Sequence, residues 1–197
     1  MSEFWIYFEN GLRHILNLFA FNHILFLIAL TVPNSYKDWK RLLLLISIFI
    51  FGHTLALTLS VFGVIIIKGN LLKLLIPATI VIVAFFNLFN AGKSLKQDSF
   101  SFVSLVTLFF GILQGLGLSS YFKSMLEVST QSKLLSLSEF SLGIFTSQII
   151  VVFIVLLLSY IVQNVFRFSR RDWILIMSSF VIGVILPMIL KNEIWNR

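Results

Sequence analysis

The chain of 197 residues is 58% hydrophobic and only 12% charged, with a mean hydropathy of +1.00. A soluble globular domain carries about 25% charged residues, so this composition excludes a soluble enzyme or binding domain and predicts an integral membrane protein. The formal net charge of +7 does not call for nucleic acid as a partner, because basic residues beside membrane spans ordinarily lie on anionic lipid. The expected partners are the lipid bilayer and other membrane proteins.

Apolar blocks follow one another along nearly the whole sequence. Residues 1–17, in which Phe4 and Trp5 stand beside Glu3 and Glu9, predict an interfacial helix that leads into the first span. A span needs about 20 apolar residues and satisfies its backbone hydrogen bonds as a helix. We therefore expect an all-α polytopic membrane protein. It should form one domain over residues 1–197, a compact bundle of about six transmembrane helices, with spans at about 18–32, 42–67, 71–89, 100–118, 140–165 and 173–190.

The distribution of basic residues predicts the orientation. Eight of the fifteen Lys and Arg residues lie in three short connections, after the first, third and fifth spans. By the positive-inside rule these connections face the cytoplasm, which places both termini outside it. The chain contains no cysteine, so it has neither a disulfide framework nor a thiolate to bind a soft metal.

Polar residues interrupt the first two apolar blocks. Asn22 and His23 lie in the first block, and His53 lies in the second. If these two spans pack as an antiparallel hairpin, His23 and His53 lie at one depth, each about 17 Å into the membrane at ~1.5 Å per residue. Two imidazoles at one depth can bind a metal ion or relay a proton. They can also hydrogen-bond to neighbouring helices, and the residues alone favour this second interpretation.

Three segments combine polar residues with fixed apolar neighbours: GLRHILNLFAFNHILFLIAL from residue 11, IFGHTLALTLSVFGVI from residue 50 and FFGILQGLGLSSYF from residue 109. They resemble, in order, motifs of the HupE/UreJ family of bacterial membrane proteins. Typical members show Gly-x-x-His, Asp-His-x-Leu-Phe-Leu, Gly-His-Thr and Phe-Gly-Leu-x-His-Gly-Leu-Gly-Phe. The resemblance implies nickel or cobalt uptake for hydrogenase and urease assembly, in the bacterial cytoplasmic membrane. Ni²⁺ or Co²⁺ would then be a substrate, and no bound cofactor is expected.

The resemblance also implies which side chains form the site. The family's histidine positions fall on His14, His23 and His53. Further polar residues that would line the site are Asn22, Gln114 and Gln148.

Four substitutions depart from the family's pattern. Asn22 replaces an aspartate of the first motif, and Gln114 replaces the histidine of the second half. Lys73 and Phe145 stand where relatives carry acidic residues. Divalent transition metals prefer imidazole and carboxylate ligands, so these substitutions predict a degraded metal site.

Other patterns have simpler interpretations. The small residues Gly111, Gly115 and Gly117 predict a face on which helices pack closely, and a close backbone approach to the site is the alternative. An intramembrane serine protease would pair a serine such as Ser119 with His53, but the chain has no Gly-x-Ser-Gly. We therefore do not expect an enzyme.

Two hypotheses of function remain. The first is a nickel or cobalt permease, or a metal-handling protein, with a degraded site. The second is a non-transporting membrane subunit or scaffold in which the former site is a packed polar core. The retained histidines favour the first hypothesis, and the four substitutions at Asn22, Lys73, Gln114 and Phe145 favour the second.

Overall fold

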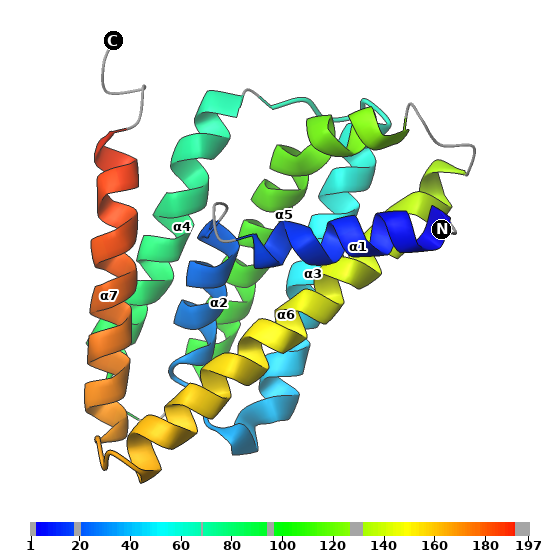
Figure 1. The fold of residues 1–197 in the computed structure, drawn as a ribbon. Helices are drawn as coiled ribbons and strands as arrows, with labels where there is room; N and C mark the ends of the chain where they lie inside the picture. Colours follow the sequence, from blue (N-terminus) through cyan, green and yellow to red (C-terminus); the bar gives the residue numbers. More distant parts are fainter. Residues whose placement is uncertain (1–2, 18–20, 68, 94–96, 127–131, 192–197) are drawn as a thin grey trace.

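α-Helices make up most of the described chain. The structure is a computed structural model that describes residues 3–17, 21–67, 69–93, 97–126 and 132–191. Its helices are, in chain order, α1 (Glu3–Leu16), α2 (Asn22–Thr31), the short 3-10 helix η2 (Tyr36–Asp38), α3 (Trp39–Val61), α4 (Gly69–Asn90), α5 (Gln97–Leu126), α6 (Lys133–Asn164) and α7 (Arg170–Leu190) (Figure 1). No strand occurs in these ranges, and the prediction of an all-α membrane bundle is confirmed.

The number of full spans differs from the prediction. Within the described residues, five helices are long and apolar enough to cross a membrane, namely α3 to α7. The span expected at residues 18–32 corresponds to α2, which has 10 residues and is about 15 Å long at ~1.5 Å per residue. That is half of the ~30 Å hydrocarbon core. Residues 18–20 of the expected span lie outside the described residues.

The half-length helix α2 is a buried core helix. It packs against α4, α6 and α7, and seven of its ten residues are buried. An apolar stretch this short is typical of a buried helix rather than of a span. Figure 1 shows α2 beginning between the two ends of the bundle and running to the end where η2 and α3 follow. The first predicted span is therefore wrong in length, because an apolar block can be buried by protein as well as by lipid.

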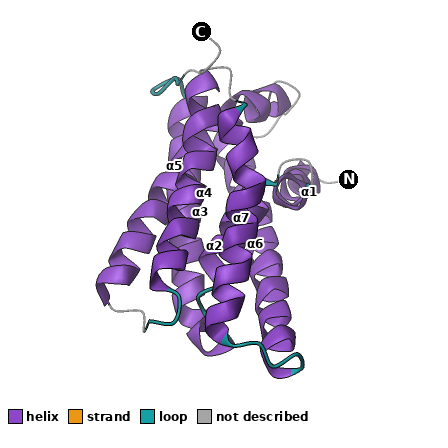
Figure 2. Cartoon of the chain, turned by 90° about the vertical axis from the view of Figure 1, so that its left-hand side faces the viewer, coloured by secondary structure: helices purple, strands orange, loops and turns teal. Residues whose placement is uncertain are grey.

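Helix α1 lies across the bundle rather than along it. Figure 1 shows it crossing α6, and Figure 2 shows it end-on at one side of the other helices. Its buried residues Tyr7, Gly11 and Ile15 follow each other at intervals of four, which places them on one face. Trp5 on another face is 54% exposed. One face of α1 thus packs on protein and the other turns outward. The expected helix is present, and its place at a membrane surface stays a prediction.

Glycines set the two closest helix contacts. A methyl group at Gly11 would overlap the carbonyl oxygen of Phe140 on α6, and one at Gly143 would overlap that of Phe8 on α1. On the other side of the bundle, a methyl group at Gly115 of α5 would overlap the carbonyl oxygen of His53 on α3. Missing Cβ atoms thus let the backbones approach, as expected for small residues at helix interfaces in membranes.

The expected hairpin of the first two predicted spans is not the main packing arrangement. Helix α3 packs chiefly against α5 and α6, whereas α2 packs against α4, α6 and α7. The rings of Phe26 and Phe49, with centroids 6.3 Å apart, still join α2 to α3. The hairpin prediction fails because α2 is too short to lie along the length of α3.

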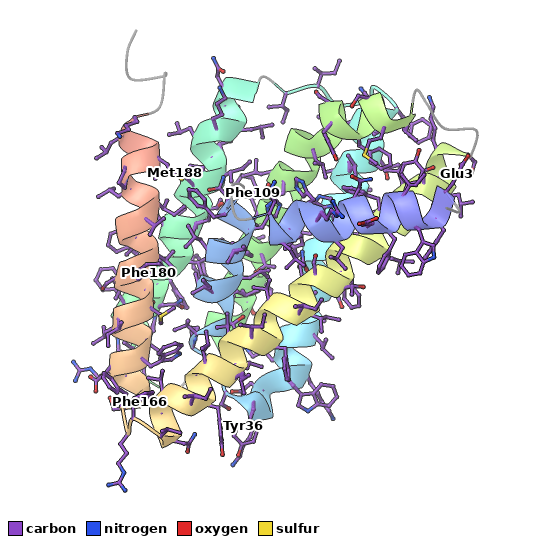
Figure 3. The ribbon with its side chains drawn as sticks, in the orientation of Figure 1. Glu3, Tyr36, Phe109, Phe166, Phe180 and Met188 are labelled. Carbon is purple, nitrogen blue, oxygen red and sulfur yellow. The ribbon has the colours of Figure 1, made fainter. Side chains whose placement is uncertain are left out.

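The three basic connections lie at one end of the bundle. The Arg170 guanidinium donates to the carbonyl oxygen of Pro33 at 2.6 Å, which ties the connection after α6 to the one after α2. Gly92, after α4, faces the side chain of Arg171. Tyr36 and Phe166 mark this end in Figure 3, and Met188 lies toward the opposite end. The three basic connections therefore share one end of the bundle.

Candidate functional site

The first histidine of the candidate site is positioned by the crossing of α1 and α6. His14 lies three residues after Gly11, where the two backbones touch, and its ring centroid is 6.3 Å from that of Phe140. Burial lowers the pKa of His14 to about 4, because the charged imidazolium loses its hydration inside the protein. The neutral ring, which is the form that binds metals, therefore predominates at neutral pH.

His14 and His23 meet where α1 ends and α2 begins. Their ring centroids are 4.8 Å apart, with the rings nearly perpendicular at 76°. His23 is the second residue of α2 and is only 5% exposed. Phe110 of α5 packs beside the pair, with its ring centroid 6.4 Å from that of His23. Two imidazoles from separate helices thus lie side by side in the interior.

His53 lies in the middle of α3 and is fully buried. Its backbone packs directly against α5, where Gly111 faces the backbone nitrogen of His53 and Gly115 faces its carbonyl oxygen. Its ring stacks on Phe49 at a centroid distance of 5.8 Å. Neither of its ring nitrogens has a hydrogen-bond partner in the described chain.

Aromatic rings join the three histidines into one cluster. Phe110 lies next to His23, and its ring centroid is 5.8 Å from that of Phe49, which in turn stacks on His53. The structure thus brings His14 and His23 into contact and places His53 at the far end of the same aromatic row.

Buried polar side chains without hydrogen-bond partners also lie on α2, α5 and α6, the helices that carry or touch the histidines. Gln148 is 1% exposed and lies one turn after Ile144, which faces Gly11 of α1. Gln114 is 6% exposed and precedes Gly115, which faces α3. Both amide atoms of Gln148, the amide nitrogen of Gln114 and the side-chain oxygen of Asn22 are buried without a hydrogen-bond partner in the described residues. Each such group costs about 1–3 kcal/mol when nothing replaces its water.

Carboxylates do not complete the cluster. Within the described ranges, no group of three or more His, Asp or Glu side chains is close enough to hold a metal ion. Asn22 occupies the position at which a carboxylate would stand beside His23. The arrangement can therefore supply two adjacent imidazoles and neutral amide oxygens, which is a sparse ligand set for a divalent transition metal.

A cavity of about 650 Å³ adjoins the cluster. Asn22 forms part of its wall, together with Lys73 of α4, Gly117 of α5 and Lys191 at the end of α7. Its wall also includes Met188, which Figure 3 shows toward the end of the bundle away from the basic connections. We call this cavity the vestibule. Periodicity did not predict it, because its walls come from four helices whose packing no short segment encodes.

The three glycines of α5 have different surroundings. Gly111 and Gly115 touch the α3 backbone on either side of His53, where a methyl group would overlap carbonyl oxygens. Gly117 has only side-chain carbons of Ile76 and Leu72 nearby, at 3.8 and 3.9 Å, and it lies in the vestibule wall. Gly111 and Gly115 therefore set the position of His53, whereas Gly117 keeps space open.

Ser119, the serine that a protease would pair with His53, bonds within its own helix. The hydroxyl of Ser119 donates to the carbonyl oxygen of Leu116 in its own helix at 2.9 Å. That hydrogen bond is local and does not involve His53.

Comparison with known proteins places the whole arrangement in one family. The family described as HupE / UreJ protein matches residues 1–192, which includes every described helix. Comparisons with curated proteins and with solved structures gave no significant match. The resemblance inferred from the motifs is thus confirmed, and the chain belongs to the HupE / UreJ family of membrane proteins.

Proposed function

We propose that this protein binds Ni²⁺ or Co²⁺ at its histidine cluster, as a permease or metal-handling membrane protein. The observation that carries the proposal is the contact between His14 and His23, whose ring centroids are 4.8 Å apart in the protein interior. Imidazole nitrogen is a favourable ligand for both metals. His53 and the amides of Gln114 and Gln148 extend the polar surroundings of the pair.

The unpaired buried groups favour this function over a packed polar core. In a core that had lost its ligand, selection for stability would pair the remaining polar groups, because each unsatisfied one costs about 1–3 kcal/mol. Here His53 is 0% exposed and both of its ring nitrogens lack partners in the described chain. A bound ligand or its hydration shell would satisfy such groups. No catalytic step is part of the proposal.

The substitutions predict weak binding. Asn22 and Gln114 replace an aspartate and a histidine of the family's pattern, so a charge and an imidazole are missing from the cluster. The loss of single outer ligands commonly reduces metal affinity by about 10–100-fold. We therefore expect micromolar rather than nanomolar binding.

Calorimetric titration of purified protein with nickel tests the proposal. Wild-type protein should bind one Ni²⁺ saturably, and the double variant His14→Phe and His23→Phe, which keeps ring packing but removes the nitrogens, should not. Affinity should fall as pH approaches about 4, where His14 becomes protonated and cannot ligate. Ser178→Ala is the control, because it removes another buried polar group, from α7. Absence of saturable binding in the wild type would instead support the non-transporting scaffold.

We further propose that the protein lies in the bacterial cytoplasmic membrane with the basic end of the bundle inside. The clustering of the three basic connections at one end supports this orientation, because positive residues favour the cytoplasmic side. Both termini would then lie outside the cytoplasm, and the vestibule would open to that outer side.

A further inference from the structure

A small cavity lies inside the basic end of the bundle, between α2, α3, α4 and α5. Its volume is about 10 Å³, close to the least space that holds one water molecule, ~10–15 Å³. Its polar wall residues are Asn34, which follows α2, Arg41 of α3 and Asn87 of α4. The rest of the wall is apolar and includes Leu30 and Leu45, which are 2% and 0% exposed.

Two buried atoms at this cavity have complementary hydrogen-bonding requirements. Asn34 is 5% exposed, and its amide nitrogen donates to the carbonyl oxygen of Leu30 at 2.9 Å, which leaves its amide oxygen as an acceptor. That oxygen has no partner in the described chain, and neither has the buried Nε–H of Arg41. The guanidinium carbon of Arg41 lies 4.9 Å from the ring centroid of Phe100, a cation–π contact that holds the donor in place. An acceptor and a donor thus line one space without bonding to each other.

We propose that this cavity binds one water molecule that joins Asn34 to Arg41. The water donates to the amide oxygen of Asn34 and accepts from the Nε–H of Arg41. Its second hydrogen goes to the side-chain oxygen of Asn87, whose amide nitrogen already donates to the carbonyl oxygen of Ala29 at 2.6 Å. Buried waters typically make about three such hydrogen bonds. A cation would meet the Arg41 guanidinium and an anion would meet the Asn34 oxygen, so a neutral molecule that both donates and accepts fits best.

The bound water ties the half-length helix α2 to its neighbours α3 and α4. It adds to two direct hydrogen bonds at the same end of α2, from Asn87 to Ala29 and from Arg170 to Pro33. Helix α2 is therefore held at its basic end by polar bonds as well as by apolar packing. The water site is separate from the histidine cluster and does not rest on metal binding there.

The sign of a cavity-filling substitution tests the proposal. Val103→Ile and Val83→Ile each add one methyl group to the cavity wall. The methyl group displaces the water and leaves Asn34 and Arg41 unsatisfied, so each variant should lower the melting temperature by about 2–12 °C. An apolar void would give the opposite result, because filling an empty cavity commonly stabilises a protein. A higher melting temperature for both variants therefore overturns the proposal.

Two further measurements separate water displacement from simple overpacking. In an Asn34→Leu background the water has already lost one partner, so the loss caused by Val103→Ile should largely disappear. An equal loss in both backgrounds indicates overpacking and contradicts the proposal. Val162→Ile, at a half-buried position of α6 outside the cavity wall, is the matched control and should leave the melting temperature unchanged. A structure at a resolution that shows ordered waters should contain one bonded to both Asn34 and Arg41, and a direct bond between these side chains would instead refute the site.

Discussion

Buried polar side chains without partners distinguish the interior of this protein from an ordinary helical core. Gln148 is 1% exposed with both amide atoms unpaired among the described residues, and His53 is 0% exposed with both ring nitrogens unpaired. By contrast, the Asn87 amide, equally buried, donates to the carbonyl oxygen of Ala29 at 2.6 Å. The helices can thus satisfy a buried amide elsewhere, and other buried groups, such as the side-chain oxygen of Asn34 and the hydroxyl of Ser178, also lack partners among the described residues.

Restoring the family's residues should strengthen metal binding. The double change Asn22→Asp and Gln114→His returns a carboxylate and an imidazole to the surroundings of His23 and His53. We expect tighter nickel binding and, in the presence of chelator, a lower melting temperature, because a buried carboxylate is costly without a counter-charge. Nickel at about 100 times its Kd should then raise the melting temperature by roughly 5–10 °C.

The control for this restoration is Asn34→Asp, which adds the same charge to a buried position near the other end of α2. It should lower stability without any response to nickel. If nickel also leaves the melting temperature of the restored variant unchanged, no metal site exists at these histidines.

At the level of helices, glycines decide where the site forms. Gly11 and Gly143 let α1 cross α6 with backbones in contact, and this crossing carries His14 to the beginning of α2. Gly111 and Gly115 do the same for α3 and α5 and hold the backbone of His53. The histidines are thus positioned by main-chain contacts, which are stiffer than contacts between long side chains.

Gly143→Ala should destabilise the protein. The added methyl group would overlap the carbonyl oxygen of Phe8, and overpacking of this kind costs about 2 kcal/mol, or roughly 4–8 °C in melting temperature. Gly183→Ala in α7 is the matched control, because nothing lies within 4 Å of its added methyl group. It should leave the melting temperature unchanged or slightly higher, since alanine favours helix more than glycine does. Equal melting temperatures for the two variants would contradict the close crossing of α1 and α6.

At the level of the whole molecule, the bundle has two unlike ends. One end carries the basic connections, tied together by the hydrogen bond from Arg170 to Pro33. The other end holds the vestibule, with Lys73 and Lys191 in its wall. The half-length helix α2 runs between the vestibule and the basic end, so a single short element connects the two regions through the core (Figure 1).

Labelling of single cysteines tests this arrangement in cells. The chain has no cysteine, so each introduced thiol reports one position. Lys37→Cys and Lys93→Cys, in the basic connections, should be protected from a membrane-impermeant reagent added outside, whereas Lys133→Cys should react. Opposite reactivity at all positions would reverse the orientation, and mixed reactivity of Lys37→Cys and Lys93→Cys would contradict a common end.

Composition and hydropathy were enough to predict a lipid environment, the helical class and five of the spans. A bilayer requires long apolar helices that satisfy their own backbone hydrogen bonds. The motifs were enough to predict the family and to name His14, His23 and His53 as candidate site residues. The length of α2 could not be predicted, because an apolar sequence has the same composition whether lipid or protein buries it. Tertiary structure alone decided three features: the contact of His14 with His23, the place of His53 along the aromatic row, and the charged vestibule. Each of them depends on how glycine-lined backbones from distant parts of the chain cross.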